Sequence, residues 1–188
     1  MQCKKAGRMI TTEEIGKYYY LFPQSVAMVS AGKNVMPAAW HTPISAKPPL
    51  YGVSVSPKRY TFELLMKAKG FTVNFLELAK ADLVAGTGGC SGRDLEKVKK
   101  FGIDFKPGNK MPGIIISDAY AAYECEKFAC QEFGDHYLFI GKILLIHYKN
   151  EIFEKGTSLD AGHLRPILYF GKDRYLTIDP KSITEIKR

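Results

Sequence analysis

Short runs rich in β-branched and aromatic residues recur along this chain, and they lack the regular helical spacers of a parallel-sheet protein. The runs with strand character span residues 25–31, 35–40, 50–56, 71–76, 119–130 and 136–150. Between these runs, helical patterns occupy residues 60–69, 77–86 and 94–102. Because these helices do not alternate regularly with strands, a doubly wound α/β fold is disfavoured. We expect a mainly β protein, built as a closed or half-closed antiparallel barrel with short helical insertions.

Local signals add detail near the N-terminus. Thr11 or Thr12, followed by two glutamates, predicts a short helix that ends by Tyr20. A turn over residues 32–34 predicts a hairpin, and Pro37 places its second strand at a sheet edge or a bulge. The three prolines in residues 41–49 predict a loop.

The chain length fits one domain. At about 100–200 residues per domain, 188 residues predict a single domain over 1–188, and no linker, repeat or low-complexity tract divides them. No apolar run approaches the roughly 20 residues that a membrane-spanning helix needs. The N-terminal residues also lack the apolar stretch of a signal peptide. We therefore expect a cytoplasmic protein with no membrane partner.

The chain carries 27 Lys and Arg against 19 Asp and Glu, a formal charge of +8. This charge suits an anionic partner such as a phosphorylated cofactor, a nucleic acid or an acidic protein. The basic residues are dispersed, and no nucleic-acid-binding signature is present, so a solvated basic surface is favoured over nucleic-acid binding.

The four histidines show no metal-binding spacing, so no metal is expected. The cysteines, at positions 3, 90, 125 and 130, form no C-x-x-C pair and are expected to be free thiols.

The segment 54–65, SVSPKRYTFELL, combines several anion-binding features. A strand is expected to end near Ser56 and a helix to begin near Tyr60, so free backbone N–H groups and the positive end of the helix dipole meet there. Lys58 and Arg59 add two cations, and Thr61 adds a hydroxyl. The segment is either a phosphate cradle or an ordinary helix start with exposed basic residues.

The segment 38–49, AAWHTPISAKPP, places Trp40 and His41 beside small residues and rigid prolines. A flat heterocycle could lie against such a segment, with main-chain N–H groups meeting its ring atoms. The alternative is that Trp40, the only tryptophan, simply fills the core.

Five motifs in one order resemble a known family. They are V-x-x-A-A-W-x-T-P-x-S-x-x-P-P, R-Y-T-x-E-L, F-x-V-N-F, G-x-x-S-G-R-D-x-x-K and G-D-H-x-L-F-x-G, between Val35 and Gly141. This series resembles the flavin reductase-like family of FMN-binding split barrels, near its flavoredoxin and archaeal ferric-reductase branch. The resemblance implies a Greek-key antiparallel split barrel with a core at about residues 18–172, and a homodimer. The tail beyond Gly171 matches no motif.

The resemblance also implies the cofactor site. It assigns the flavin ring to Ala39, Trp40, His41, Thr42 and Pro43. It assigns the phosphate and ribityl chain to Ser56, Lys58, Arg59, Tyr60 and Thr61, with Ser54 in the same cofactor-binding set. Asn74 is implied beside the cofactor, and Cys90, Ser91, Gly92 and Arg93 in a loop near it, across the dimer interface in many family members. The turn at Gly134, Asp135 and His136 is implied to be partly structural.

The expected function is an NAD(P)H-dependent flavin or ferric reductase with bound FMN and with NADH or NADPH as electron donor. The alternative is a flavoredoxin-like electron carrier that a redox protein partner reduces. The third hypothesis is a basic barrel that binds nucleic acid and no flavin. Hydride transfer to a flavin needs stacking rather than a side-chain acid or base, so no catalytic residue is assigned. His41 and His136 are candidates for shaping the open face or carrying a proton, and Cys90 is a redox or an inert thiol.

Overall fold

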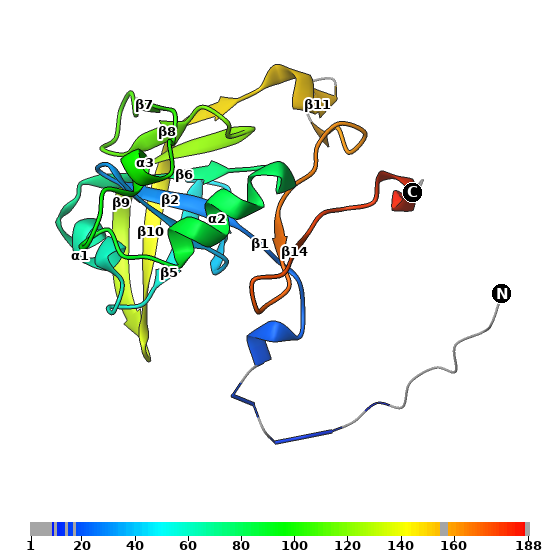
Figure 1. The fold of residues 1–188 in the computed structure, drawn as a ribbon, viewed down its shortest axis with the longest axis horizontal. Helices are drawn as coiled ribbons and strands as arrows, with labels where there is room; N and C mark the ends of the chain where they lie inside the picture. The colour runs from blue at the N-terminus through cyan, green and yellow to red at the C-terminus, as the bar shows by residue number, and fades with distance from the viewer. Residues whose placement is uncertain (1–8, 10, 14, 17, 155–157, 187–188) are drawn as a thin grey trace.

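The fold is a curled antiparallel half-barrel with a few short helices (Figure 1). The computed structural model describes residues 9, 11–13, 15, 16, 18–154 and 158–186. Its main sheet has the strand order β3-β2-β6-β9-β10-β5-β4, and every neighbouring pair is antiparallel. These strands are β2 (Ala27–Ala31), β3 (Asn34–Ala38), β4 (His41–Ser45), β5 (Leu50–Val55), β6 (Gly70–Phe75), β9 (Ala121–Phe133) and β10 (His136–Tyr148). The predicted mainly β, split-barrel fold is confirmed.

The two edge strands of the sheet are consecutive in the chain. Only Ala39 and Trp40 separate β3 from β4, although five strands lie between them in the sheet order. The sheet must therefore curl until its edges approach each other. The backbone N–H of Ser54 on β5 donates to the Trp40 carbonyl at 2.8 Å, which extends the β4–β5 pairing into this connection.

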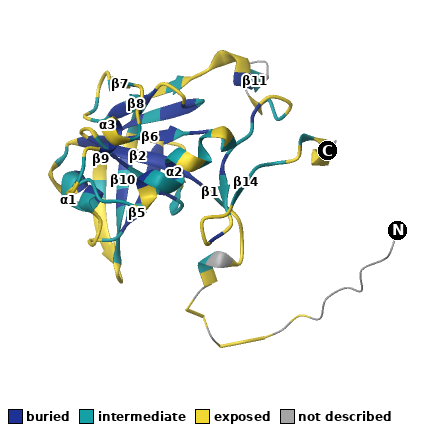
Figure 2. Ribbon diagram, viewed as in Figure 1, coloured by how far each residue is buried: buried dark blue, intermediate teal, exposed yellow. Residues whose placement is uncertain are grey.

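Two apolar clusters hold the structure together, and Figure 2 shows their strands as the most buried part of the molecule. The first fills the barrel, where Phe71 and Phe139 are fully buried and helix α1 (Tyr60–Lys67) contributes Leu65. The second lies between the sheet and the segments that cover it: α2 (Ala81–Gly88), α3 (Lys97–Lys100), β7 (Phe105–Pro107) and β8 (Ile114–Ile116).

Segments from both ends of the chain pack together beside the barrel (Figure 1). Strand β1 (Gln24–Ser25) pairs with β13 (Leu168–Tyr169), which pairs with β14 (Tyr175–Leu176). The remaining elements are β11 (Phe153–Glu154), β12 (Ser158–Leu159) and the 3-10 turns η1 (Tyr18–Tyr20), η2 (Leu78–Lys80), η3 (Asn150–Ile152) and η4 (Pro180–Ser182). No helix within the described ranges has both the length and the apolar character to cross a membrane.

The predicted hairpin of β2 and β3 is present, with Pro37 on an edge strand as expected. The predicted loop over residues 41–49 is wrong in its first half, because residues 41–45 form β4 and pair with β5. Among the described residues of the expected helix over 11–20, only Tyr18–Tyr20 are helical, as a 3-10 turn. The helix predicted over residues 94–102 is shorter than expected, because α3 begins at Lys97. Asp94 lies in the preceding turn, where its N–H donates to the Ser91 carbonyl at 3.2 Å.

Gly32 occupies the hairpin turn with φ +58°, in the left-handed region that side chains disfavour. We expect Gly32→Ala to lower the free energy of unfolding by about 1–2 kcal/mol, because alanine is strained there even though a Cβ would have open space. Urea denaturation of the variant measures this loss. Gly16→Ala is the matched control, since Gly16 also has open space but no positive φ. Equal stability of the two variants would contradict the strain argument.

A buried carboxylate anchors the loop between β7 and β8. Glu124 on β9 is fully buried and accepts backbone N–H donors from Asn109, Lys110 and Met111 at 2.8, 2.6 and 2.8 Å. Its other polar contact is Nε2 of His147 on β10, at 2.7 Å. Burial alone would raise the pKa of Glu124, but these hydrogen bonds outweigh it and lower the pKa. Glu124 therefore stays charged and holds the loop in place.

Candidate cofactor site

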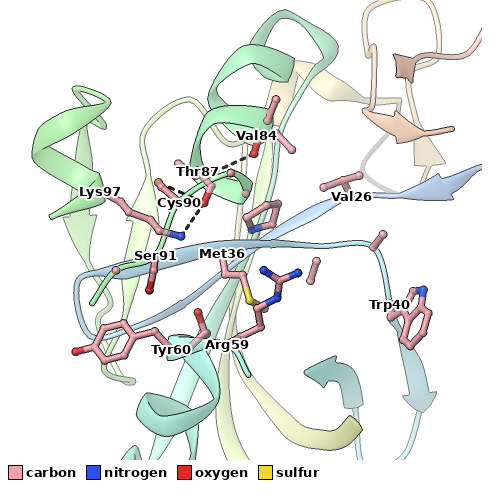
Figure 3. A pocket seen from close by; sticks show the side chains of 18 of the residues that line it. Val26, Met36, Trp40, Arg59, Tyr60, Val84, Thr87, Cys90, Ser91 and Lys97 are labelled. Atoms are coloured by element: carbon pink, nitrogen blue, oxygen red, sulfur yellow. Dashed lines mark hydrogen bonds between the residues drawn. The ribbon is translucent and has the colours of Figure 1, made fainter. Parts of the chain in front are cut away.

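A cavity of about 880 Å³ opens beside β3, between the start of α1 and the end of α2 (Figure 3). The loop after α2 and the β13–β14 segment complete its wall. The volume lies within the range of small-molecule and cofactor sites, roughly 300–1,000 Å³. Segments far apart in the sequence thus form one site.

The corner between β5 and α1 is built as the sequence predicts. Strand β5 ends at Val55, and the Arg59 N–H donates to the Ser56 carbonyl at 3.0 Å. The Lys58 N–H lies 3.5 Å from Ser56 Oγ. Helix α1 starts at Tyr60, and no side chain caps its N-terminus. The Phe62 N–H donates to the Arg59 carbonyl at 3.0 Å, and the N–H groups before it in the first turn, with the positive end of the helix dipole, are available to an anion.

The cavity wall carries four basic side chains, Lys58, Arg59, Arg93 and Lys97, against a single carboxylate, Asp173. Arg93 is ion-paired with Glu63, and its guanidinium lies 5.5 Å from the centre of the Tyr60 ring. Arg59 forms no side-chain hydrogen bond or ion pair within the described part of the chain, and its guanidinium lies in the cavity (Figure 3). Arg59 is therefore the cation best placed to meet an incoming anion.

Lys97 is a buried amine in the same wall. Only 5% of it is exposed, and its Nζ donates to the carbonyls of Val35 at 3.0 Å and Thr87 at 2.7 Å. Thr87 lies in the last turn of α2, whose carbonyl groups carry partial negative charge. Burial lowers the pKa of Lys97, and the charge of Arg59 acts in the same direction. Lys97 ties α2 to β3 and so fixes the width of the cavity.

Trp40 closes the opposite end of the cavity (Figure 3). The centres of its ring and the His136 ring are 4.7 Å apart, with an interplanar angle of 42°. His136 is held by Asp135, whose Oδ1 lies 2.7 Å from His136 Nδ1. On another side, Tyr19 meets Trp40 edge-on, with ring centres 5.4 Å apart. The indole therefore forms a flat wall fixed by aromatic neighbours.

The structure gathers most of the sequence-predicted site residues around this cavity. They are Ala39, Trp40, Ser54, Lys58, Arg59, Tyr60, Thr61, Cys90, Ser91, Gly92 and Arg93. His41 and Thr42 line a neighbouring cavity, of about 500 Å³, that shares Trp40 with the first. Ser56, Pro43 and Asn74 line neither cavity. Ser56 instead shapes the corner, and Pro43 is an exposed residue of β4.

Asn74 is placed in the sheet interior rather than beside the cavity. It is fully buried on β6, and its Nδ2 donates to the carbonyls of Met28 at 3.3 Å and Ile114 at 3.1 Å. Its Oδ1 accepts the Ile116 N–H at 2.9 Å. These bonds join β2, β6 and β8, so in this structure Asn74 acts in packing.

The loop 90–93 lies close against the start of α1. A Cβ on Gly92 would collide with Oδ1 of Asn34 and with the Tyr60 ring, so glycine is needed there.

Cys90 is half-buried in the cavity wall, and its Sγ donates to the Gly86 carbonyl at 3.4 Å. Burial raises the pKa of Cys125, which lies in the barrel core, to about 12. Cys90, Cys125 and Cys130 are free thiols, and the described residues contain no cluster able to hold a metal ion.

Sequence reasoning missed several lining residues. Lys97 was given no role, although it is the last residue of the motif G-x-x-S-G-R-D-x-x-K, because in sequence it resembles the exposed lysines Lys99 and Lys100. Tyr169, Asp173 and Tyr175 reach the cavity from the C-terminal strands, beyond the motifs that carry the resemblance. Only the tertiary fold brings them there.

His41 connects β4 to its neighbours through both ring nitrogens. Nε2 lies 3.1 Å from the Ser25 carbonyl, which only accepts, so Nε2 carries the proton. Nδ1 then accepts the Tyr51 hydroxyl at 2.6 Å. Burial raises the pKa of Tyr51, which keeps its proton, and burial lowers the pKa of His41. His41 is therefore neutral in the folded protein.

The lowered pKa of His41 predicts a pH-dependent stability. Between the lowered folded value and the unfolded value of about 6.5, the unfolded chain binds a proton that the folded chain does not. We expect the free energy of unfolding to fall as the pH drops through this range. In His41→Gln the fall should be smaller, as measured by urea denaturation at several pH values. An unchanged pH dependence in the variant would contradict this assignment.

Fold and site together define a flavin reductase-like protein, and family comparison agrees. The model of the flavin reductase like domain matches residues 19–179, so the chain belongs to this family. An uncharacterised protein of Pyrococcus abyssi is 37% identical over 145 residues, covering 74% of this chain and 82% of its own length.

Solved structures of similar proteins share the fold. An FMN-binding protein of Thermus thermophilus, crystallised with 1-cyclohex-2-enone, is 31% identical, with a TM-score of 0.81 over 98% of this chain and 100% of its own. The flavoredoxin of Methanosarcina acetivorans is 23% identical, with a TM-score of 0.79 over 93% and 92% of the two chains, and this likeness concerns the fold alone.

Proposed function

We propose that this protein binds FMN in the larger cavity, with the phosphate at the corner formed by residues 56–61. The observation that carries this proposal is the Arg59 guanidinium, which lies in the cavity beside the uncapped start of α1. The FMN-binding protein of Thermus thermophilus, 31% identical, supports the choice of cofactor.

The donors in the cavity fit a flavin mononucleotide. A phosphate dianion needs cations and N–H donors, and the corner offers Lys58, Arg59 and the first turn of α1. The Thr61 hydroxyl, which accepts from Asn34 at 2.8 Å, lies in the same wall. The far end of the cavity offers the flat face of Trp40 and the small Ala39, which suit a planar ring.

We infer that the protein is an oxidoreductase of the NAD(P)H-dependent flavin or ferric reductase type, acting as a homodimer. Bound FMN supplies the capacity to accept a hydride and pass electrons on singly or in pairs. Lys58 and Arg59 neutralise the phosphate, and Trp40 and His136 shape the ring end of the cavity. The flavoredoxin-like alternative, an electron carrier reduced by a protein partner, uses the same residues.

Two measurements test this proposal. The purified protein is expected to carry, or to bind after addition, one FMN per chain, as shown by its visible spectrum. Rapid anaerobic mixing of the FMN-loaded protein with NADH and with NADPH then distinguishes the two functions. Bleaching of the flavin band supports the reductase. Bleaching by dithionite but by neither nicotinamide supports the electron carrier, and failure to bind FMN contradicts both.

A further inference from the structure

A second cavity, of about 500 Å³, lies on the other side of Trp40, between the N-terminal segment and strands β4 and β5. Tyr18, Tyr19 and Phe22 contribute its outer wall, and His41 and Thr42 its inner wall. The two cavities share Ala39, Trp40 and Ser54. The second cavity is thus contiguous with the first but has a wall of its own.

Trp40 is the partition between the two cavities. Its ring contacts His136, which lines the first cavity, at 4.7 Å between centres. It also contacts Tyr19, which lines the second, at 5.4 Å between centres. A ligand in the second cavity would therefore meet a rigid aromatic surface that is already held in position.

The second cavity differs from the first in charge. Among the residues that the structure describes, no Asp, Glu, Lys or Arg lines it, whereas four basic side chains line the first. His41, its one ionisable imidazole, has both ring nitrogens engaged, by Ser25 and by Tyr51. An anionic ligand would lose its hydration here without gaining a cation, which is costly. A dinucleotide, with its charged pyrophosphate, is disfavoured for the same reason.

We propose that this second cavity is a binding site for uncharged, planar, conjugated carbonyl compounds. Its aromatic lining provides faces for stacking. Among its few polar groups, the Ser54 hydroxyl provides a hydrogen-bond donor for a carbonyl oxygen, whereas the Thr42 hydroxyl donates to the Pro43 carbonyl at 3.3 Å. The site depends on the fold alone and does not require that the first cavity hold FMN.

Isothermal titration with coumarin, an uncharged planar lactone, tests this inference on the full chain. We expect saturable binding of one coumarin per chain. Thr42→Phe, at an exposed position of an edge strand, fills the cavity and should weaken binding by at least about tenfold. Phe22→Ala removes part of the outer wall and should weaken binding by about 2- to 10-fold.

Phe128→Ala is the matched control. Phe128 is 59% exposed and Phe22 is 54% exposed, but Phe128 lies on β9 and lines neither cavity. This control should bind coumarin as the parent protein does. Coumarin-3-carboxylate, the anionic analogue, should fail to displace bound coumarin. Absence of saturable binding, insensitivity to both cavity variants, or displacement by the anion would overturn the proposal.

A parallel titration with FMN separates this inference from the proposed function. If FMN does not bind but coumarin binding responds to Thr42→Phe, the second site stands and the proposed cofactor is wrong. If FMN binds but coumarin does not saturate, the second site is wrong and the proposed cofactor stands.

Discussion

Replacing Arg59 with alanine is expected to weaken FMN binding by about 1.5–3 kcal/mol, or roughly 10- to 150-fold in Kd. A guanidinium can hold a phosphate through two parallel charge-assisted hydrogen bonds, and alanine removes both. The side chain has no competing partner among the described residues, so its free energy of interaction goes to the ligand. Fluorescence titration of FMN against the flavin-free protein measures the change.

Two further variants distinguish a direct phosphate contact of Arg59 from a general effect of positive charge. Lys67→Ala removes one positive charge from the last turn of α1, the helix that follows Arg59, where the Lys67 side chain is exposed and lies outside the cavity. It should leave the affinity nearly unchanged, because solvent screens distant charges. Arg59→Lys keeps the charge but loses the paired geometry, so its affinity should be intermediate. Equal losses for Lys67→Ala and Arg59→Ala would show a general charge effect instead of a phosphate contact.

Replacing Glu124 with alanine is expected to lower the free energy of unfolding by about 3–5 kcal/mol. The carboxylate is fully buried and receives hydrogen bonds from Asn109, Lys110, Met111 and His147. Without it, three backbone N–H groups and one imidazole lose their acceptor together. Urea denaturation at neutral pH measures the loss. A loss below about 1 kcal/mol would mean that water replaces the carboxylate without penalty.

The same carboxylate predicts an acid-dependent stability. The folded pKa of Glu124 is lowered, so its contribution is fully present above the unfolded value, about 4.3, and is lost as the pH falls through the folded value. The stability difference between the parent protein and Glu124→Ala should therefore shrink on acidification. A difference that is constant with pH would contradict the assignment of a charged Glu124.

The strands were predictable because their signals are local. The turn at Gly32 and the alternation around it predict the hairpin, and the structure pairs the same residues. Strand β4 was not predictable, because its prolines favour a loop and only its pairing with β5 makes it a strand. The helix predicted from Thr11 and Thr12 is wrong for the described residues, of which only Tyr18–Tyr20 are helical, and Ile15 is 74% exposed and buries no apolar face there.

The candidate site was predictable where it is contiguous in sequence. The corner at Ser56 to Thr61 needs only a strand end, a helix start and two cations, all visible in the sequence. Asn74 illustrates the limit, because a motif position near the site can serve packing instead. Lys97 and Tyr175 illustrate the opposite limit, since only long-range packing brings them to the cavity.

The most direct test of the phosphate corner compares the affinities of FMN and riboflavin for the parent protein and for Arg59→Ala. Riboflavin has the same ring and ribityl chain but no phosphate. We expect the parent protein to bind FMN at least about tenfold more tightly than riboflavin, and Arg59→Ala to lose most of this preference. Equal affinities for the two flavins in the parent protein would contradict it.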